Sequence, residues 1–210
     1  MAKFKRLEKP RKSRRVFLII SEGDIEKIYF NQYNKYLNQL DGKVNINVYT
    51  AGHTTDPLGI VKYAIKKIKA SKDRKIFEKI FCVFDTDTIK QGAENKKNFI
   101  KAEELAKKHN FGLITSFPCF ELWLLLHFED YSKPGVKCEI IIKRLQEFLP
   151  SYPEDKNKNA FERINFFDSY LNRLGNAINR AKNLNSKNYS DNSIDYPDTK
   201  IYEIFEIIKQ

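Results

Sequence analysis

The chain has 210 residues, of which 41% are hydrophobic and 13% are aromatic. That length fits a single domain with a modest appendage, and that apolar content excludes a chain that is disordered throughout. The apolar runs at 16–20 and 122–126 are too short to cross a bilayer, and no signal peptide is visible. We therefore expect a cytoplasmic protein with no membrane partner.

The cysteine pattern favours the same compartment. Cys82, Cys119 and Cys138 are odd in number, and no two of them form a CxxC pair. This argues against a disulfide framework or a zinc ribbon and indicates a reducing environment.

The formal net charge of +11 is unevenly spread, because residues 1–15 hold eight Lys/Arg and one Glu. Such an arm suits a polyanion, since neutralising phosphates releases condensed counterions. A solvated tail that aids solubility is an equally good interpretation. The nucleic-acid-binding candidates in the arm are Arg11, Lys12, Arg14 and Arg15.

Strands and helices alternate along the first half of the chain. The apolar patterns predict strands at 16–20, 44–50, 79–84 and 111–117, and helices at 24–40, 58–70 and 93–110. Alternation of this kind is typical of βαβ units, so we expect an α/β fold with a parallel sheet flanked by helices.

The second half changes character and is helical in pattern. Helices are expected at 120–128, 136–149, 161–184 and 199–209, separated by polar linkers at 151–159 and 185–198. The predicted organisation is a basic arm (1–15), an α/β core (16–118) and a helical portion packed on the core (119–210).

Acidic residues follow two of the apolar strands. Glu22 comes directly after the first strand, and Asp85 and Asp87 close the third. Carboxyl ends of parallel strands share one edge of the sheet, where open α/β folds bind ligands. Because side chains alternate in extended chain, Asp85 and Asp87 are expected to point the same way and to converge with Glu22.

Carboxylates gathered at one point repel each other unless a cation offsets them, and oxygen ligands favour Mg²⁺ or Mn²⁺. Gly23 is expected to let the backbone turn sharply after Glu22. Glu26 falls four residues beyond Glu22, where one helix face would let both share a metal. Each motif alone is weak, since a DxD after a strand often only caps a turn, but the ordered pair is more specific.

The combination resembles a Toprim domain, in which a strand-end Glu and a strand-end DxD bind the catalytic metal. Across nearly its whole length the chain is similar to the RloB family. The matching stretches are the basic start, SEGDIEKIYF (21–30), FDTD (84–87), SFPCFELWLLLHFEDYSK (116–133), AINRAK (177–182) and DYPDTKIYEIFEII (195–208).

The resemblance implies a Toprim-like nuclease, encoded beside an AAA-type ATPase in prokaryotic phage-defence (abortive infection) loci. It assigns catalysis to Glu22, Asp85 and Asp87, with Mg²⁺ or Mn²⁺ as cofactor. By position it adds Glu26 and Glu121, in PCFELW, as metal ligands, although an acid in a first helical turn is favoured by the helix dipole anyway. The expected partners are DNA or RNA and the ATPase, and a homo-oligomer stays open.

Other polar residues have weaker cases. His53, in a loop after the second strand, and Lys133 are candidates to contact phosphate, as is Lys182. Loop histidines and surface lysines usually have no such role. His127 is expected to be packed rather than catalytic, and Trp123 to be core.

Two rival functions stay open. Asp85-Thr86-Asp87-Thr88 begins like the motif of haloacid-dehalogenase-type phosphatases, but that fold places DxD after its first strand and needs a second acidic pair after a later one. The other rival is a non-catalytic adaptor that binds the ATPase or nucleic acid through the helical half.

Overall fold

The computed structural model describes residues 14–52, 54, 56–70, 77–87, 89, 92–153, 161–166, 170–191 and 196–210, with the side chains of 187–191 left out. Arg11, Lys12 and His53, which the sequence singled out as phosphate contacts, lie outside the described residues.

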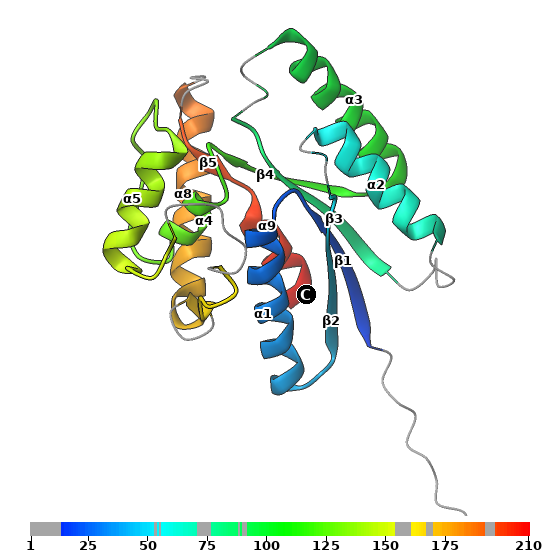
Figure 1. Cartoon of the computed structure of the whole chain (residues 1–210), viewed down its shortest axis with the longest axis horizontal. Coiled ribbons are helices and arrows are strands. Elements are labelled where there is room, and N and C mark those ends of the chain that lie inside the picture. The colour runs from blue at the N-terminus through cyan, green and yellow to red at the C-terminus, as the bar shows by residue number, and fades with distance from the viewer. Residues whose placement is uncertain are drawn as a thin grey trace, which may run out of the picture.

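A mostly parallel sheet runs through the molecule (Figure 1). In the described residues its order is β2-β1-β3-β4-β5, and only β5 is antiparallel to its neighbour β4. The strands are β1 (Arg15–Ser21), β2 (Val44–Thr50), β3 (Phe77–Asp85), β4 (Gly112–Phe117) and β5 (Asp198–Thr199). The α/β class is confirmed, and all four predicted strands are present.

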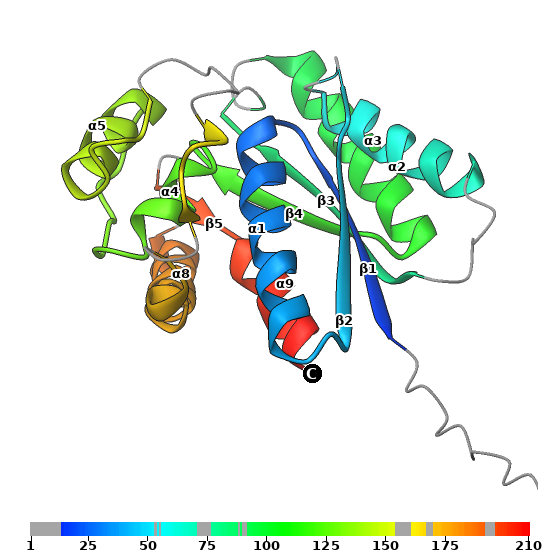
Figure 2. The same cartoon turned by 60° about the horizontal axis from the view of Figure 1, so that its bottom comes forward.

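Helices cover both faces of the sheet (Figure 2). One face carries α2 (Pro57–Ala70) and α3 (Ala93–His109). The other carries α1 (Asp24–Leu40) and α9 (Ile201–Lys209). Beyond this second face lie the remaining labelled helices, α4 (Glu121–Leu125), α5 (Cys138–Phe148) and α8 (Leu174–Asp191).

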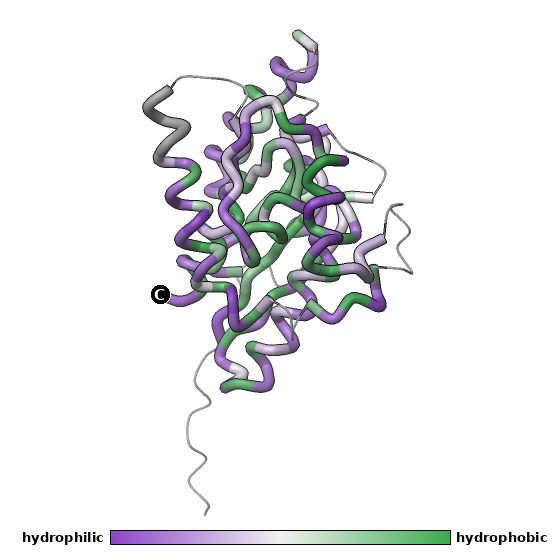
Figure 3. The backbone as a smooth tube through the Cα atoms, turned by 90° about the vertical axis from the view of Figure 1, so that its left-hand side faces the viewer, coloured by the Kyte–Doolittle hydropathy of each residue, from purple (hydrophilic) through white to green (hydrophobic). Residues whose placement is uncertain are grey.

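The apolar strands explain this layering. Phe17 and Ile19 of β1 face the α1 and α9 side, whereas Leu18 and Ile20 face α2 and α3, and all four are fully buried. A strand that is buried on both faces needs an unbroken apolar run rather than alternation. Figure 3 shows the result, with hydrophobic segments in the middle of the molecule and surrounding helices in which hydrophilic and hydrophobic residues alternate.

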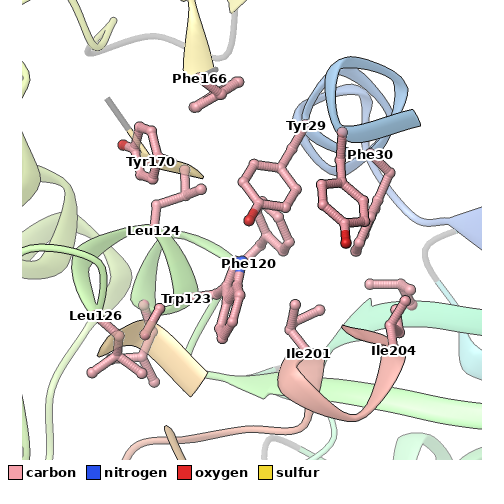
Figure 4. Close-up of a cluster of buried hydrophobic side chains, with 14 of the residues drawn as sticks. Tyr29, Phe30, Phe120, Trp123, Leu124, Leu126, Phe166, Tyr170, Ile201 and Ile204 are labelled. Atoms are coloured by element: carbon pink, nitrogen blue, oxygen red, sulfur yellow. The ribbon is translucent and has the colours of Figure 1, made fainter. Parts of the chain in front are cut away.

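The larger core is aromatic and fixes the segment after β4 (Figure 4). Trp123, fully buried as predicted, stacks on Phe205 at 5.3 Å between ring centroids. Tyr29 meets Phe120 edge to face at 5.6 Å. Because Phe120 directly precedes Glu121 and Trp123 lies two residues after it, this packing determines where that carboxylate lies.

The helical half differs from its prediction in three places. The helix expected at 161–184 is confirmed only in its second part, which lies in α8, because the chain is not helical at residues 164 and 165. There the Gln32 side chain donates to the Ile164 carbonyl and accepts from the Phe166 N–H, at 2.7 and 2.8 Å. α8 instead runs on to Asp191, into the expected linker, and Asp198–Thr199 form β5.

β5 is held by side chains as well as by its ladder. The Thr199 hydroxyl pairs with that of Ser116 at 2.9 Å, and the Asn185 amide donates to the Thr199 carbonyl at 3.0 Å. Among the described residues, no helix is long and apolar enough to cross a membrane.

Candidate functional site

Glu22 and Asp85 are tied together where β1 and β3 end. The Glu22 N–H donates to the Val83 carbonyl at 2.9 Å. The Asp85 N–H in turn donates to Glu22 Oε2 at 3.0 Å. Because β1 and β3 are neighbours in register, the two acids meet at the carboxyl edge of the sheet, as predicted.

The turn from β1 into α1 makes room for a third acid. The buried Ser21 hydroxyl donates to the Gly23 carbonyl at 2.9 Å. Gly23 has φ −113° and ψ 171°, extended backbone that any residue adopts, so the expected need for a sharp glycine turn is wrong. A Cβ at this position would lie 2.7 Å from Glu26 Oε2, so glycine here leaves space for the Glu26 carboxylate.

A pocket of about 140 Å³ opens at this edge. Among the described residues eight line it, of which five are acidic and none is basic; they are Glu22, Gly23, Asp24, Ile25, Glu26, Asp85, Glu121 and Phe161. Glu26 and Glu121 are each only 3% exposed. The structure therefore brings together Glu22, Glu26, Asp85 and Glu121 and adds Asp24, which the sequence reading did not single out.

Asp87 is not among the residues that line this pocket. β3 ends at Asp85, and the chain is already turning at Asp87. Between them the Thr86 N–H and hydroxyl both donate to the Ser116 carbonyl, at 2.9 and 3.2 Å. The predicted convergence of Asp87 with the other acids assumed extended chain, and β3 ends two residues earlier, so alternation along the strand does not decide where the Asp87 carboxylate points and the convergence stays a prediction.

Glu121, the first residue of α4, faces the helical half with both oxygens. Tyr152 donates its hydroxyl to Glu121 Oε1 at 2.8 Å. Cys138 Sγ lies 3.5 Å from Glu121 Oε2. Burial is the largest cause that raises the pKa of Tyr152, and the neighbouring Glu121 charge raises it further. The phenol therefore stays protonated and is the hydrogen-bond donor. Tyr152 falls in a stretch predicted as linker, and no sequence pattern pointed to it.

Cys119 and Cys138 are joined in a disulfide with their Cα atoms 5.7 Å apart. The inference from the cysteine count, that the chain has no disulfide, is therefore wrong for two of the three residues. The two sulfurs and a Glu121 oxygen lie within 4.8 Å of one another. The cysteines are 19 residues apart, so a search for local spacing does not find the pair.

The basic candidates in the described part of the chain lie away from the pocket. Arg15 begins β1 at the opposite edge, roughly 20 Å away along the strand. Its guanidinium binds Glu78 and the carbonyls of Ile207 and Ile208. The neighbouring Arg14 is exposed and bonds Asn38.

The candidate lysines are also elsewhere. Lys133 is exposed beside a separate groove that Glu129 and Arg144 help to line. Lys182 forms an ion pair with Glu206. In contrast, Asp198, which was not predicted as a site residue, pairs with Phe117 at the carboxyl end of β4 and adds a further acid to that edge of the sheet.

His127 is buried in the aromatic core, as expected for a packed histidine. Its Nδ1 bonds the Trp123 carbonyl at 2.9 Å, so Nδ1 carries the proton. Nε2 then accepts from the Tyr29 hydroxyl at 3.3 Å. Burial lowers the pKa of His127 to about 3, so the ring is neutral, and His127 is not among the described residues that line the acidic pocket.

Comparison with known proteins gives a family match over nearly the whole chain. No curated protein and no solved structure matches it. The family model described as RloB-like protein matches residues 17–208, from the start of β1 to the end of α9. On that match the chain belongs to the RloB-like family.

Proposed function

We propose that this protein is a metal-dependent nuclease that hydrolyses phosphodiester bonds in nucleic acid at the acidic pocket. The observation that carries the proposal is the meeting of Glu22, Glu26 and Asp85 at the carboxyl ends of β1 and β3. Acids from separate segments that lie together and are partly buried repel each other. They oppose folding unless a bound cation or substrate offsets this repulsion.

The residues present fit a divalent metal with a preference for oxygen. The pocket offers carboxylates and no basic side chain among its described lining residues, which suits Mg²⁺ or Mn²⁺. When bound, such a metal polarises the phosphate, activates water and stabilises the leaving oxygen. The ligands that the geometry favours are Glu22, Glu26 and Asp85, whereas Glu121 Oε1 accepts from Tyr152 and Glu121 Oε2 lies beside the Cys138 sulfur.

The chain holds these ligands in place before substrate arrives. The Asp85 N–H fixes Glu22 Oε2, and the missing side chain at Gly23 admits Glu26. α1 begins at Asp24, so the positive end of its dipole lies at the pocket and partly offsets the carboxylate charges. Phe161 closes one wall with an apolar ring, which limits the access of water.

Substrate charge makes the metal necessary. A phosphodiester is anionic, and an acidic pocket repels it without a cation between them. The chain as a whole carries +11, which attracts nucleic acid to the protein. Membership of the RloB-like family supports a role in phage defence with an AAA-type ATPase partner, and this role is part of the proposal.

The direct test incubates purified protein with plasmid, single-stranded DNA and total RNA in Mg²⁺, Mn²⁺ or EDTA. We expect cleavage that needs metal and that Asp85→Asn lowers by about 100-fold or more. Glu104→Gln is the matched control, because Glu104 is an exposed acid on α3, outside the pocket.

Metal binding is measured separately by thermal unfolding. Mg²⁺ at about 100 times its dissociation constant adds about 2.7 kcal/mol to the stability of the protein it binds. Asp85→Asn should lose this stabilisation while Glu104→Gln keeps it. A protein that neither gains stability from metal nor cuts any substrate, with the ATPase present, would be an adaptor and not a nuclease.

A further inference from the structure

We propose that Cys119, Cys138 and Glu121 form a zinc site in the reduced chain. Glu121 also lines the acidic pocket, but the zinc site uses none of the three carboxylates proposed to hold magnesium or manganese, and it does not depend on nuclease activity. The two sulfurs and a carboxylate oxygen already lie within 4.8 Å of one another. What remains to be explained is why a carboxylate is placed beside a cysteine pair.

A disulfide alone gives the carboxylate no reason to be there. Glu121 is 3% exposed, and its Oε2 lies 3.5 Å from Cys138 Sγ. A disulfide sulfur carries no hydrogen, so Cys138 cannot donate to that oxygen, and a disulfide does nothing to offset the cost of burying a carboxylate. A cation between the oxygen and two thiolates satisfies all three groups at once.

Zinc is the metal that this ligand set selects. Thiolates are soft ligands that favour Zn²⁺ over Mg²⁺, and zinc accepts mixed sulfur and oxygen ligands. Zn–S bonds of about 2.3 Å at tetrahedral angles place two sulfurs roughly 3.8 Å apart, so the sulfurs separate once their bond is reduced. Three protein ligands leave the fourth position to water.

Tyr152 supplies the support that a ligating carboxylate needs. Its hydroxyl donates to Glu121 Oε1 at 2.8 Å and leaves Oε2 directed at the sulfur. Such an outer hydrogen bond orients a metal ligand, and its loss typically costs 10–100-fold in affinity, as an order of magnitude. Tyr152 is itself 2% exposed, so the bond is shielded from water.

The three ligands come from segments that zinc would join. Cys119 lies between β4 and α4, Glu121 begins α4, and Cys138 begins α5. Zinc bound here would link α5 to the end of the sheet in the reduced chain, as the disulfide does in the oxidised one. Two thiols reduce the disulfide by supplying two electrons and two protons and become a disulfide themselves, whereas a phosphine supplies the electrons, takes an oxygen from water to become a phosphine oxide, and leaves the two water protons on the sulfurs. Zinc then displaces the thiol protons.

The experiment starts from full-length protein reduced with a phosphine, in which a thiol reagent counts all three cysteines after a sample is denatured, because Cys82 is fully buried in the folded chain. After addition of Zn²⁺ with Mg²⁺ in large excess and removal of unbound metal, we expect about one tightly held zinc per chain by elemental analysis. Co²⁺ in place of Zn²⁺ should give the sulfur-to-cobalt charge-transfer band that reports thiolate coordination directly.

Variants locate the site. Cys119→Ser with Cys138→Ser should lose the zinc and the cobalt band, whereas Cys82→Ala keeps both, because Cys82 faces α2 and α3 across the sheet. Glu121→Gln, which keeps both thiols, should weaken zinc binding by at least about tenfold. Asp85→Asn should keep the zinc, so that failure of the nuclease proposal leaves this one standing.

Three results would overturn the zinc site. They are a fully reduced wild type that holds no zinc, a cobalt complex without a sulfur charge-transfer band, and zinc binding that the double cysteine variant retains. The wild-type cobalt spectrum needs no variant, so a variant that fails to fold does not obscure the outcome.

Discussion

The two edges of the sheet handle charge in opposite ways. At the amino edge, charges of opposite sign pair near the surface, as Arg15 does with Glu78, whose side chains are 31% and 44% exposed. At the carboxyl edge, charges of one sign gather instead, and Glu26 and Glu121 are almost fully buried. Both edges belong to the same strands, so the difference does not come from the type of secondary structure.

That difference separates charged residues that stabilise the fold from charged residues that reduce its stability and are kept for another reason. Exposed opposite charges add a little stability, and folding alone accounts for them. Like charges in a pocket oppose folding, so a ligand is the reason to keep them. Changing an acid at each edge should therefore affect different properties of the protein.

The largest expected effect comes from a matched pair of Glu→Gln changes. Glu22→Gln keeps an oxygen to accept the Asp85 N–H but removes the charge. We expect metal-dependent cleavage to fall about 10²–10³-fold, with unfolding free energy in EDTA unchanged or higher. Cleavage assays and urea denaturation measure the two quantities.

Glu78→Gln is the partner of that experiment at the other edge. It breaks the ion pair with Arg15, so stability should fall by under about 1 kcal/mol while cleavage stays at the wild-type rate. If Glu78→Gln abolished cleavage, or Glu22→Gln left it intact, the contrast between the edges would be wrong.

The part of the site predictable from sequence is the part that strands carry. Apolar runs at β1 and β3 indicated parallel strands, and parallel strands bring Glu22 and Asp85 to one edge. Asp87 was expected there too, but β3 ends at Asp85, and the alternation rule does not hold in a turn.

The rest of the site depends on contacts between distant segments. Tyr152 reaches Glu121 across 31 residues, and β5 is two residues long, too short to show any periodicity. Cys119 and Cys138 are joined through the packing of α5 against α4. None of these leaves a local pattern, since tertiary packing alone brings the groups together.

The second largest effect concerns a titratable group that neither edge contains. The pKa of buried His127 is about 3, below its ordinary 6.5, so the unfolded chain takes up the proton first as pH falls. This group has no effect on stability above pH 6.5, and below it the folded state loses about 1.4 kcal/mol per pH unit down to about pH 3.

His127→Gln removes this titration. The variant should be less stable than wild type at pH 7.5, because it disrupts the bonds to Tyr29 and Trp123. The gap should narrow as pH falls toward 4.5 in urea denaturation at each pH. A gap that stays constant would mean that His127 is not the neutral, buried group described.

Tyr152→Phe should have an intermediate effect at the carboxyl edge. It removes the hydroxyl that donates to buried Glu121 Oε1 and adds no bulk. An acceptor left without its donor costs about 1–3 kcal/mol, so unfolding free energy should fall by that order in the reduced, metal-free protein. Tyr131→Phe is the control, because Tyr131 lies beside the separate groove near Lys133; equal losses in the two variants would argue against a special role for the Glu121 contact.

The smallest effect is the coupling between Arg15 and Glu78 at the amino edge. The pair is bidentate, and the hydrogen bond to Glu78 raises the pKa of Arg15, yet both side chains are partly exposed. Solvent screening limits such pairs, so a double-mutant cycle with Arg15→Ala and Glu78→Ala should give about 0.2–1 kcal/mol. That coupling should shrink further in 1 M salt. Arg15→Ala alone should cost more than the coupling, because the guanidinium also binds the carbonyls that end α9. A coupling of several kcal/mol would mean that charges at the exposed amino edge interact as strongly as charges at the buried carboxyl edge. Burial would then no longer explain why the two edges differ.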